Sequence, residues 1–230
     1  MLSQAEKGGI QNTIQNCVTV LQNDPVLADS IRLNLLSERI DIVKPMGWQR
    51  SGPTLTDTDM MYILRRMEKY GLYSEKRVSA AIRIVANENH YHPIRDCLND
   101  LKWDGAERIS HALHRFLGAA EDELTAEALK IFLLGAIRRV FHPGCKFEMM
   151  LCLVGGQGAG KSSFFRLLAI KDEWFSDDLR RLDDDNVFRK LQGHWIMEMS
   201  EMIATANAKS IEEIKSFLSK QKETYKIPYE

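Results

Sequence analysis

Residues 155–162 combine glycines with a lysine and a serine at a spacing that suits phosphate chemistry. They match G-x-x-x-x-G-K-[ST] in full and read Gly155, Gly156, Gln157, Gly158, Ala159, Gly160, Lys161 and Ser162. Glycines let successive backbone N–H groups face phosphate oxygens, and a helix that follows adds partial positive charge at its N-terminus. In this pattern Lys161 contacts the β- and γ-phosphates and the Ser162 hydroxyl binds Mg²⁺. We therefore expect an ATP and Mg²⁺ site here, with Ser163 as a supporting hydroxyl. The alternative, a flexible glycine-rich turn, does not explain the lysine and the serine.

A nucleotide site of this kind also needs a carboxylate that holds Mg²⁺ or activates the attacking water. The segment 194–201 offers Glu198 and Glu201. Glu198 lies within an apolar run, where an unpaired carboxylate is costly, and Glu201 lies at the expected carboxyl end of a strand, where parallel sheets bind ligands. We slightly favour Glu201 and keep both as catalytic and metal-binding candidates beside Lys161. Exposure on an edge strand, or pairing with an arginine, is the alternative for each.

The elements around these residues alternate between strand and helix. The continuous apolar run 149–154 is typical of a buried parallel strand, and residues 162–170 follow it as a helix. A second helix is expected from about residue 184 to Leu191, with Gly193 as its C-terminal cap, and a strand at 195–199. The last helix is expected to begin at Ser210, which has capping-box spacing to Glu213.

The region before the turn signal His142-Pro143-Gly144 is mostly helical by its pattern. Apolar residues at helical spacing precede Pro25, and the alternating segments 31–35 and 39–43 predict a small hairpin. Further helices are expected after Thr56, which has capping-box spacing to Asp59, after Ser74, and from Pro93, followed by two more near residues 109–116 and 122–140. The sequence thus predicts an α/β protein with a mostly helical domain at residues 1–141 and an incomplete P-loop NTPase domain at residues 146–230.

Composition describes an ordinary globular protein. Of the 230 residues, 44% are hydrophobic and 27% are charged, which excludes a disordered or collagen-like chain. The net charge of −1 gives no bulk support for nucleic-acid binding, so DNA contact would need a local patch such as one of the paired basic residues, which are more often a solvated face. The four cysteines form no C-x-x-C pair, and the N-terminus and hydropathy show no signal peptide or membrane span. We therefore expect a cytoplasmic protein without a zinc site.

Several segments together resemble the virulence-associated protein E family, P-loop ATPases related to superfamily 3 helicases and encoded on bacterial prophages and other mobile elements. The resemblance covers nearly the whole chain and is far more specific than the glycine-rich loop alone. The segments that carry it are 55–59 (LTDTD), 92–96 (HPIRD) running into 101–105 (LKWDG), 143–147 (PGCKF), 155–162, 191–198 (LQGHWIME) with Glu201, and 215–219 (KSFLS).

The resemblance implies ATP-driven work on DNA during replication of the element. It also implies a primase beside or fused to the ATPase, a homo-oligomeric ring, and a Walker B role for the strand that carries Glu198 and Glu201. The family continues with a Tyr-Gly-Arg-like stretch, whereas this chain ends in YKIPYE at 225–230. The later strands, the polar sensor residue and the arginine finger are then missing, and we expect the chain to be incomplete for ATP hydrolysis.

Three functions follow from the motif together with the resemblance. The first is an ATP-binding ATPase of the replicative helicase type, in which Lys161 and Ser162 bind phosphate and Mg²⁺. The second is a non-hydrolysing DNA- or partner-binding module, in which the helical region is the functional part and the nucleotide site is vestigial or regulatory. The third, a P-loop kinase for a small molecule, is weak because the sequence reveals neither an acceptor site nor a lid.

Overall fold

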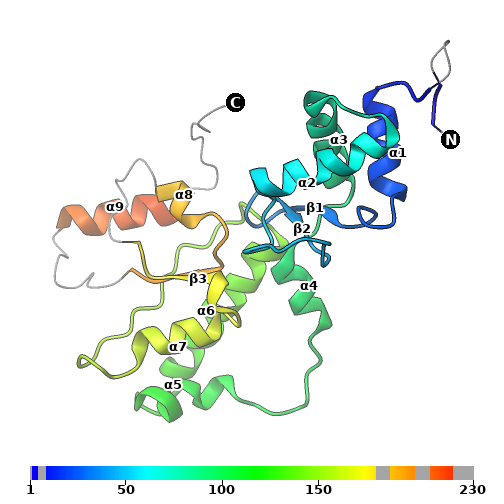
Figure 1. Cartoon of the computed structure of the whole chain (residues 1–230). Coiled ribbons are helices and arrows are strands. Elements are labelled where there is room, and N and C mark those ends of the chain that lie inside the picture. Colours follow the sequence, from blue (N-terminus) through cyan, green and yellow to red (C-terminus); the bar gives the residue numbers. More distant parts are fainter. Residues whose placement is uncertain (1, 5–8, 180–186, 200–207, 220–230) are drawn as a thin grey trace. The chain divides into compact units, whose positions relative to one another are not determined.

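The structure is a computed structural model that describes residues 2–4, 9–179, 187–199 and 208–219 of the chain. The chain divides into two compact units, Met1–Asp96 and Cys97–Glu230. Among the described residues helices dominate and strands are short, so the fold is a mixture of helices with small sheets, compatible with the expected α/β class (Figure 1). The predicted domain boundary at residues 141–146 lies inside the second unit and stays a prediction.

The first unit packs helices against a small hairpin. Its elements are α1 (Ile14–Asn23), β1 (Ile31–Asn34), β2 (Arg39–Ile42), α2 (Asp57–Met67), the 3₁₀ helix η1 (Glu68–Tyr70) and α3 (Glu75–Glu88). The hairpin is antiparallel, with Ile31 opposite Ile42, and both side chains are buried. They join a core with Leu21 of α1, Ile63 of α2 and Ile82 of α3. The hairpin predicted from the alternating pattern is thus confirmed.

Local sequence signals set the ends of these helices. Thr56 and Asp59 form the predicted capping box at the start of α2, with the hydroxyl accepting from the Asp59 N–H and the carboxylate accepting from the Thr56 N–H. Ser74 occupies the N-cap position of α3, although its side chain makes no capping hydrogen bond there. The helix α4 (Pro93–Asp100) begins at the predicted proline and spans the boundary between the units.

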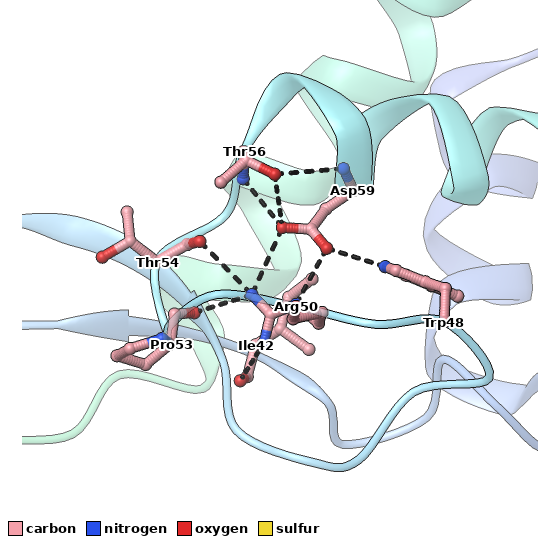
Figure 2. Close-up of polar contacts among 7 residues, drawn as sticks. All are labelled: Ile42, Trp48, Arg50, Pro53, Thr54, Thr56 and Asp59. Carbon is pink, nitrogen blue, oxygen red and sulfur yellow. Dashed lines mark hydrogen bonds and ion pairs between the residues drawn. The ribbon is translucent and has the colours of Figure 1, made fainter.

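Asp59 also ties the loop before α2 to the unit's core. Its carboxylate accepts from the Trp48 indole N–H at 2.7 Å and from the Arg50 Nε–H at 2.8 Å (Figure 2). Arg50 in turn donates to the carbonyl oxygens of Ile42 and Pro53, so one guanidinium links the hairpin, the loop and the helix. Burial alone would raise the pKa of Asp59, but the hydrogen bonds from Arg50, Trp48 and Thr56 outweigh it and hold the pKa well below its usual range.

The second unit carries the glycine-rich segment. Its elements are α5 (Ile109–Leu117), α6 (Glu123–Phe141), α7 (Lys161–Leu168), the 3₁₀ helix η2 (Asp172–Trp174), β3 (Phe175–Ser176), α8 (Val187–Leu191), β4 (Ile196–Met197) and α9 (Ala208–Ser219). Leu113 of α5, Leu129 of α6 and Phe164 of α7 form a small buried core, so these three helices lie together (Figure 1). β3 and β4 pair in parallel, with Phe175 beside Ile196.

The predicted strand at 149–154 is wrong, because the structure assigns no strand to these residues. Leu151 and Leu153 are half-buried and pack against the core of α5, α6 and α7, whereas Cys152 and Val154 are exposed. One side of this segment is therefore covered, and among the described strands none forms a ladder with it.

The other predicted elements of the second unit form with shifted bounds. The strand expected at 195–199 is the shorter β4, and Gly193, expected as a helix cap, has a positive φ of 86° shortly after α8. α8 is described from Val187 onward, since residues 184–186 lie outside the described residues, and α9 begins at Ala208 rather than at Ser210. Within the described ranges, no helix has the length and apolar character that crossing a membrane requires.

Candidate functional site

The glycine-rich loop, residues 155–160, leads directly into α7. Gly158 and Gly160 adopt φ values of 78° and 82°, a region that residues with a Cβ rarely enter. Gly160 is the N-cap residue of α7, and no side chain caps this end among the described residues. The first backbone N–H groups of α7, including those of Lys161 and Ser162, are therefore open to an acceptor that enters the loop.

Lys161 folds back over the loop that precedes it. Its ammonium group donates hydrogen bonds to the carbonyl oxygens of Gly155 at 2.9 Å and Gly156 at 2.7 Å. Both acceptors are neutral, and a charged phosphate oxygen would form a shorter and stronger bond to the same ammonium. The lysine is thus held at the loop by contacts that an anionic ligand can replace.

Ser162 and Glu198 come together from distant parts of the chain. The Ser162 hydroxyl, in the first turn of α7, donates to Glu198 Oε1 at 2.7 Å. Glu198 directly follows β4, and its backbone N–H donates to the Ser176 carbonyl oxygen at 2.8 Å, so the parallel β3–β4 pair sets its position. The sequence placed Glu198 within a strand; in the structure it directly follows β4 and meets the serine of the motif.

The second carboxylate oxygen of Glu198 is buried, and it makes no hydrogen bond to any residue that the structure describes. A buried carboxylate oxygen without a partner is costly unless a cation or a donor reaches it. Mg²⁺ takes oxygen ligands and binds through one or two carboxylates together with phosphates and waters. The Ser162 hydroxyl and the Glu198 carboxylate therefore fit a Mg²⁺ ion.

The remaining predicted site residues lie as follows. Gln157 and Ala159 are exposed in the loop, and Ser163 is exposed in the first turn of α7. Glu201, the other carboxylate candidate, lies outside the described residues, so the structure locates only Glu198 of the pair. No group of three or more histidine, cysteine, aspartate or glutamate side chains suited to a metal ion occurs within the described part of the chain.

Sequence reasoning missed the apolar wall beside the loop. Leu113 and Leu117 of α5 and Ala128 of α6 line a cavity of about 500 Å³ that also reaches Gly155 and Lys161. In the sequence these three residues look like ordinary inward positions of amphipathic helices. Their place beside the loop depends on how α5, α6 and α7 pack, and no local pattern reports that packing.

Comparison with known proteins places the second unit in a family. A family model described as the virulence-associated protein E-like domain matches residues 98–230. A search of curated proteins found no match. The matched region covers more than half of the chain and contains the glycine-rich loop, α7 and Glu198. The chain therefore belongs to the virulence-associated protein E-like family, and through it to proteins associated with phages and mobile elements.

Proposed function

We propose that this chain binds ATP with Mg²⁺ through residues 155–162, as the nucleotide-binding part of a helicase-type ATPase that acts in replication of a prophage or mobile element. The observation that carries the proposal is the contact between Ser162 and Glu198, 36 residues apart in the chain. A glycine-rich turn without a function gives no reason for Glu198, with a buried oxygen that no described residue meets, to contact the serine of the motif.

Each residue has a defined part in this proposal. The open N–H groups at the start of α7 bind phosphate oxygens, and Lys161 exchanges its two carbonyl acceptors for oxygens of the β- and γ-phosphates. Ser162 and Glu198 hold Mg²⁺ through their oxygens. When bound, that ion neutralises charge on the phosphates and fixes their geometry. Glu198 or Glu201 would orient and deprotonate the attacking water.

The wider setting of the proposal comes from family membership. In that setting the ATPase works on DNA, beside or fused to a primase, and assembles as a homo-oligomer. The chain's net charge of −1 means that any DNA contact relies on local groups rather than on overall attraction.

The test is calorimetric titration of ATP with Mg²⁺ into the purified chain and into Lys161→Ala. We expect saturable binding by the wild type and about tenfold to a hundredfold weaker binding by the variant, because a charge-assisted contact to phosphate contributes roughly 1.5 to 3 kcal/mol. Lys130→Ala is the matched control, since Lys130 is an exposed lysine of α6 that pairs with Glu127. Equal affinity of wild type and Lys161→Ala would refute the proposal.

A further inference from the structure

The β3–β4 pair that carries Glu198 is short. Each strand has two residues, and Phe175 pairs with Ile196 at the start of the ladder. A ladder of this length gives the strands little stability by itself. The contact between Glu198 and Ser162 therefore needs a further anchor for β4, because the carboxylate directly follows that strand.

Trp195, the residue directly before β4, ties the strand to α6. Its indole N–H donates to the Ala136 carbonyl oxygen at 3.2 Å, 59 positions away in the chain. Ala136 lies inside α6, and a carbonyl oxygen has two lone pairs, so it can accept from the indole as well as within the helix. The backbone N–H of Trp195 donates to the Trp174 carbonyl oxygen at 2.7 Å. One residue thus connects the start of β4 both to α6 and to the residue before β3.

A second aromatic ring packs against the Trp195 side chain. Trp174 is only 2% exposed, and its ring meets the Trp195 ring edge-on, with the centroids 6.5 Å apart and the planes at 77°. This edge-to-face arrangement is a favoured geometry for aromatic pairs. Because Trp174 is buried, the Trp195 ring packs against a fixed surface, which holds its N–H toward α6.

We propose that Trp195 is a positioning residue for the metal site, because it anchors the start of β4 to α6 and so sets the place of Glu198 against Ser162. This inference rests on the proposed binding of ATP with Mg²⁺ and adds a residue that touches neither ligand. At the other end of β4, the Glu198 N–H donates to the Ser176 carbonyl oxygen at 2.8 Å, so the strand is held at both ends. An indole that only filled space would act through its ring, whereas the positioning role also requires its N–H.

The test is Trp195→Phe, which keeps an aromatic ring and removes the N–H. The readout is the gain in ATP affinity that Mg²⁺ provides, measured by calorimetric titration of the whole chain with and without Mg²⁺. We expect this gain to fall by about threefold to tenfold, the scale of one lost hydrogen bond, while the Kd for ATP without Mg²⁺ stays unchanged. Trp103→Phe is the matched control, because Trp103 is 81% exposed, and it should keep the full gain.

A double-mutant cycle with Glu198→Gln separates positioning from a general loss of structure. Glu198→Gln keeps a side-chain oxygen, so we expect a smaller but measurable gain from Mg²⁺ in this background. If Trp195 acts through Glu198, Trp195→Phe lowers the gain in the wild type and has no further effect on it in Glu198→Gln.

The outcomes distinguish this inference from the proposal beneath it. An equal loss in both backgrounds, no loss in the wild-type background, or a wild type that binds ATP equally with and without Mg²⁺ overturns the positioning role and leaves the phosphate site standing. If the wild type binds no ATP, the proposed nucleotide binding fails and the positioning role fails with it.

If Trp195→Phe loses its helical signal in circular dichroism, NMR of the wild type replaces the variant. Addition of Mg²⁺ to the ATP-bound chain should shift the indole N–H resonance of Trp195, because the ion takes the Glu198 carboxylate and the change reaches Trp195 through β4. The indole resonance of the exposed Trp103 should stay in place. An unmoved Trp195 resonance overturns the inference.

Discussion

Asp59 is a buried carboxylate whose charge is balanced by a single guanidinium. Its side chain is 3% exposed, and the Arg50 partner is 12% exposed. Because solvent is largely excluded, removing the charge leaves Arg50 without its partner. We expect Asp59→Asn to lower the free energy of unfolding of the first unit by about 3 kcal/mol at pH 7, measured by urea denaturation. Asp29→Asn is the control, because the Asp29–Lys44 pair is exposed and should change stability by less than about 1 kcal/mol.

Two buried carboxylates give the first unit a defined pH response. The pKa of Asp59 is lowered by its hydrogen bonds, and the pKa of Asp24 is lowered in the same way. At Asp24, burial alone would raise the pKa, but hydrogen bonds from Arg66, Tyr70 and two backbone N–H groups outweigh burial and hold the pKa below its usual range. A lowered folded-state pKa contributes stability above the unfolded pKa of about 3.9, and that stability is lost as the pH falls below it. Urea denaturation should therefore show a constant unfolding free energy near neutral pH and a decline below about pH 4. In Asp59→Asn that decline should be shallower, and an equally steep decline would contradict the assignment.

The contact between Ser162 and Glu198 predicts how Mg²⁺ acts. Ser162→Ala removes the hydroxyl and leaves the loop backbone in place. We expect the gain in ATP affinity that Mg²⁺ provides to fall by about tenfold, the equivalent of one lost ligand interaction of about 1.4 kcal/mol, while binding without Mg²⁺ changes little. Ser162→Thr keeps a hydroxyl at this position and should retain the Mg²⁺ effect. If Ser162→Thr lost the Mg²⁺ effect although it keeps a hydroxyl, the role given to the hydroxyl would be contradicted.

At the scale of elements, α6 depends on one glycine. Gly135 is buried, and the Phe147 ring lies where a Cβ on Gly135 would be, closer than real Cβ atoms approach. The Arg139 guanidinium donates to the Phe147 carbonyl oxygen at 2.8 Å and so holds the phenylalanine on the helix. This close contact fixes the residues just before the 149–154 segment.

Replacing Gly135 sets two effects against each other. Alanine favours a helix by about 1 kcal/mol over glycine, but forcing a methyl group into the Phe147 ring costs typically 1 to 3 kcal/mol or more. We expect Gly135→Ala to destabilise the second unit, seen as a lower midpoint in thermal unfolding by circular dichroism. In the Phe147→Leu background, adding Gly135→Ala should lower the midpoint by less than Gly135→Ala lowers it in the wild type. A midpoint for Gly135→Ala above that of the wild type would show that the ring is not held there.

Signals that lie in neighbouring residues were predictable from the sequence, whereas the partners that a strand finds elsewhere in the chain were not. The capping box at Thr56 and the helix start at Pro93 are local, and the structure has both. A strand needs a ladder partner from elsewhere, and the apolar run 149–154 has none among the described strands. The same reason hid the second role of Asp59 as the partner of Arg50, since the two residues lie nine positions apart with an irregular loop between Arg50 and the start of α2.

In the candidate site too, contiguous residues were predictable from the sequence, and residues that meet only through packing were not. The residues that bind phosphate are contiguous, so their motif is visible in the sequence, and so is the acidic segment that carries Glu198. The sequence slightly favoured Glu201 over Glu198; the structure places Glu198 beside Ser162, and Glu201 lies outside the described residues. The apolar wall beside the loop depends on the packing of α5 and α6, which no spacing within either helix reports.

At the scale of the whole molecule, the candidate site belongs to one unit alone. The loop, α7, Glu198 and the cavity all lie within Cys97–Glu230. A ligand that binds there stabilises the structure it contacts, by about 2.7 kcal/mol at a concentration a hundred times its Kd. The first unit, with its own core, provides an internal reference that should not respond.

Hydrogen exchange read by mass spectrometry, with and without ATP and Mg²⁺, tests the central claim most directly. Phosphate oxygens that accept from the backbone N–H groups of the loop and of the start of α7 should slow exchange across residues 155–168. Exchange in residues 14–88 should stay the same, and Lys161→Ala should remove the protection. Unchanged exchange across 155–168 at saturating ATP, or equal protection in wild type and Lys161→Ala, would contradict nucleotide binding at this loop.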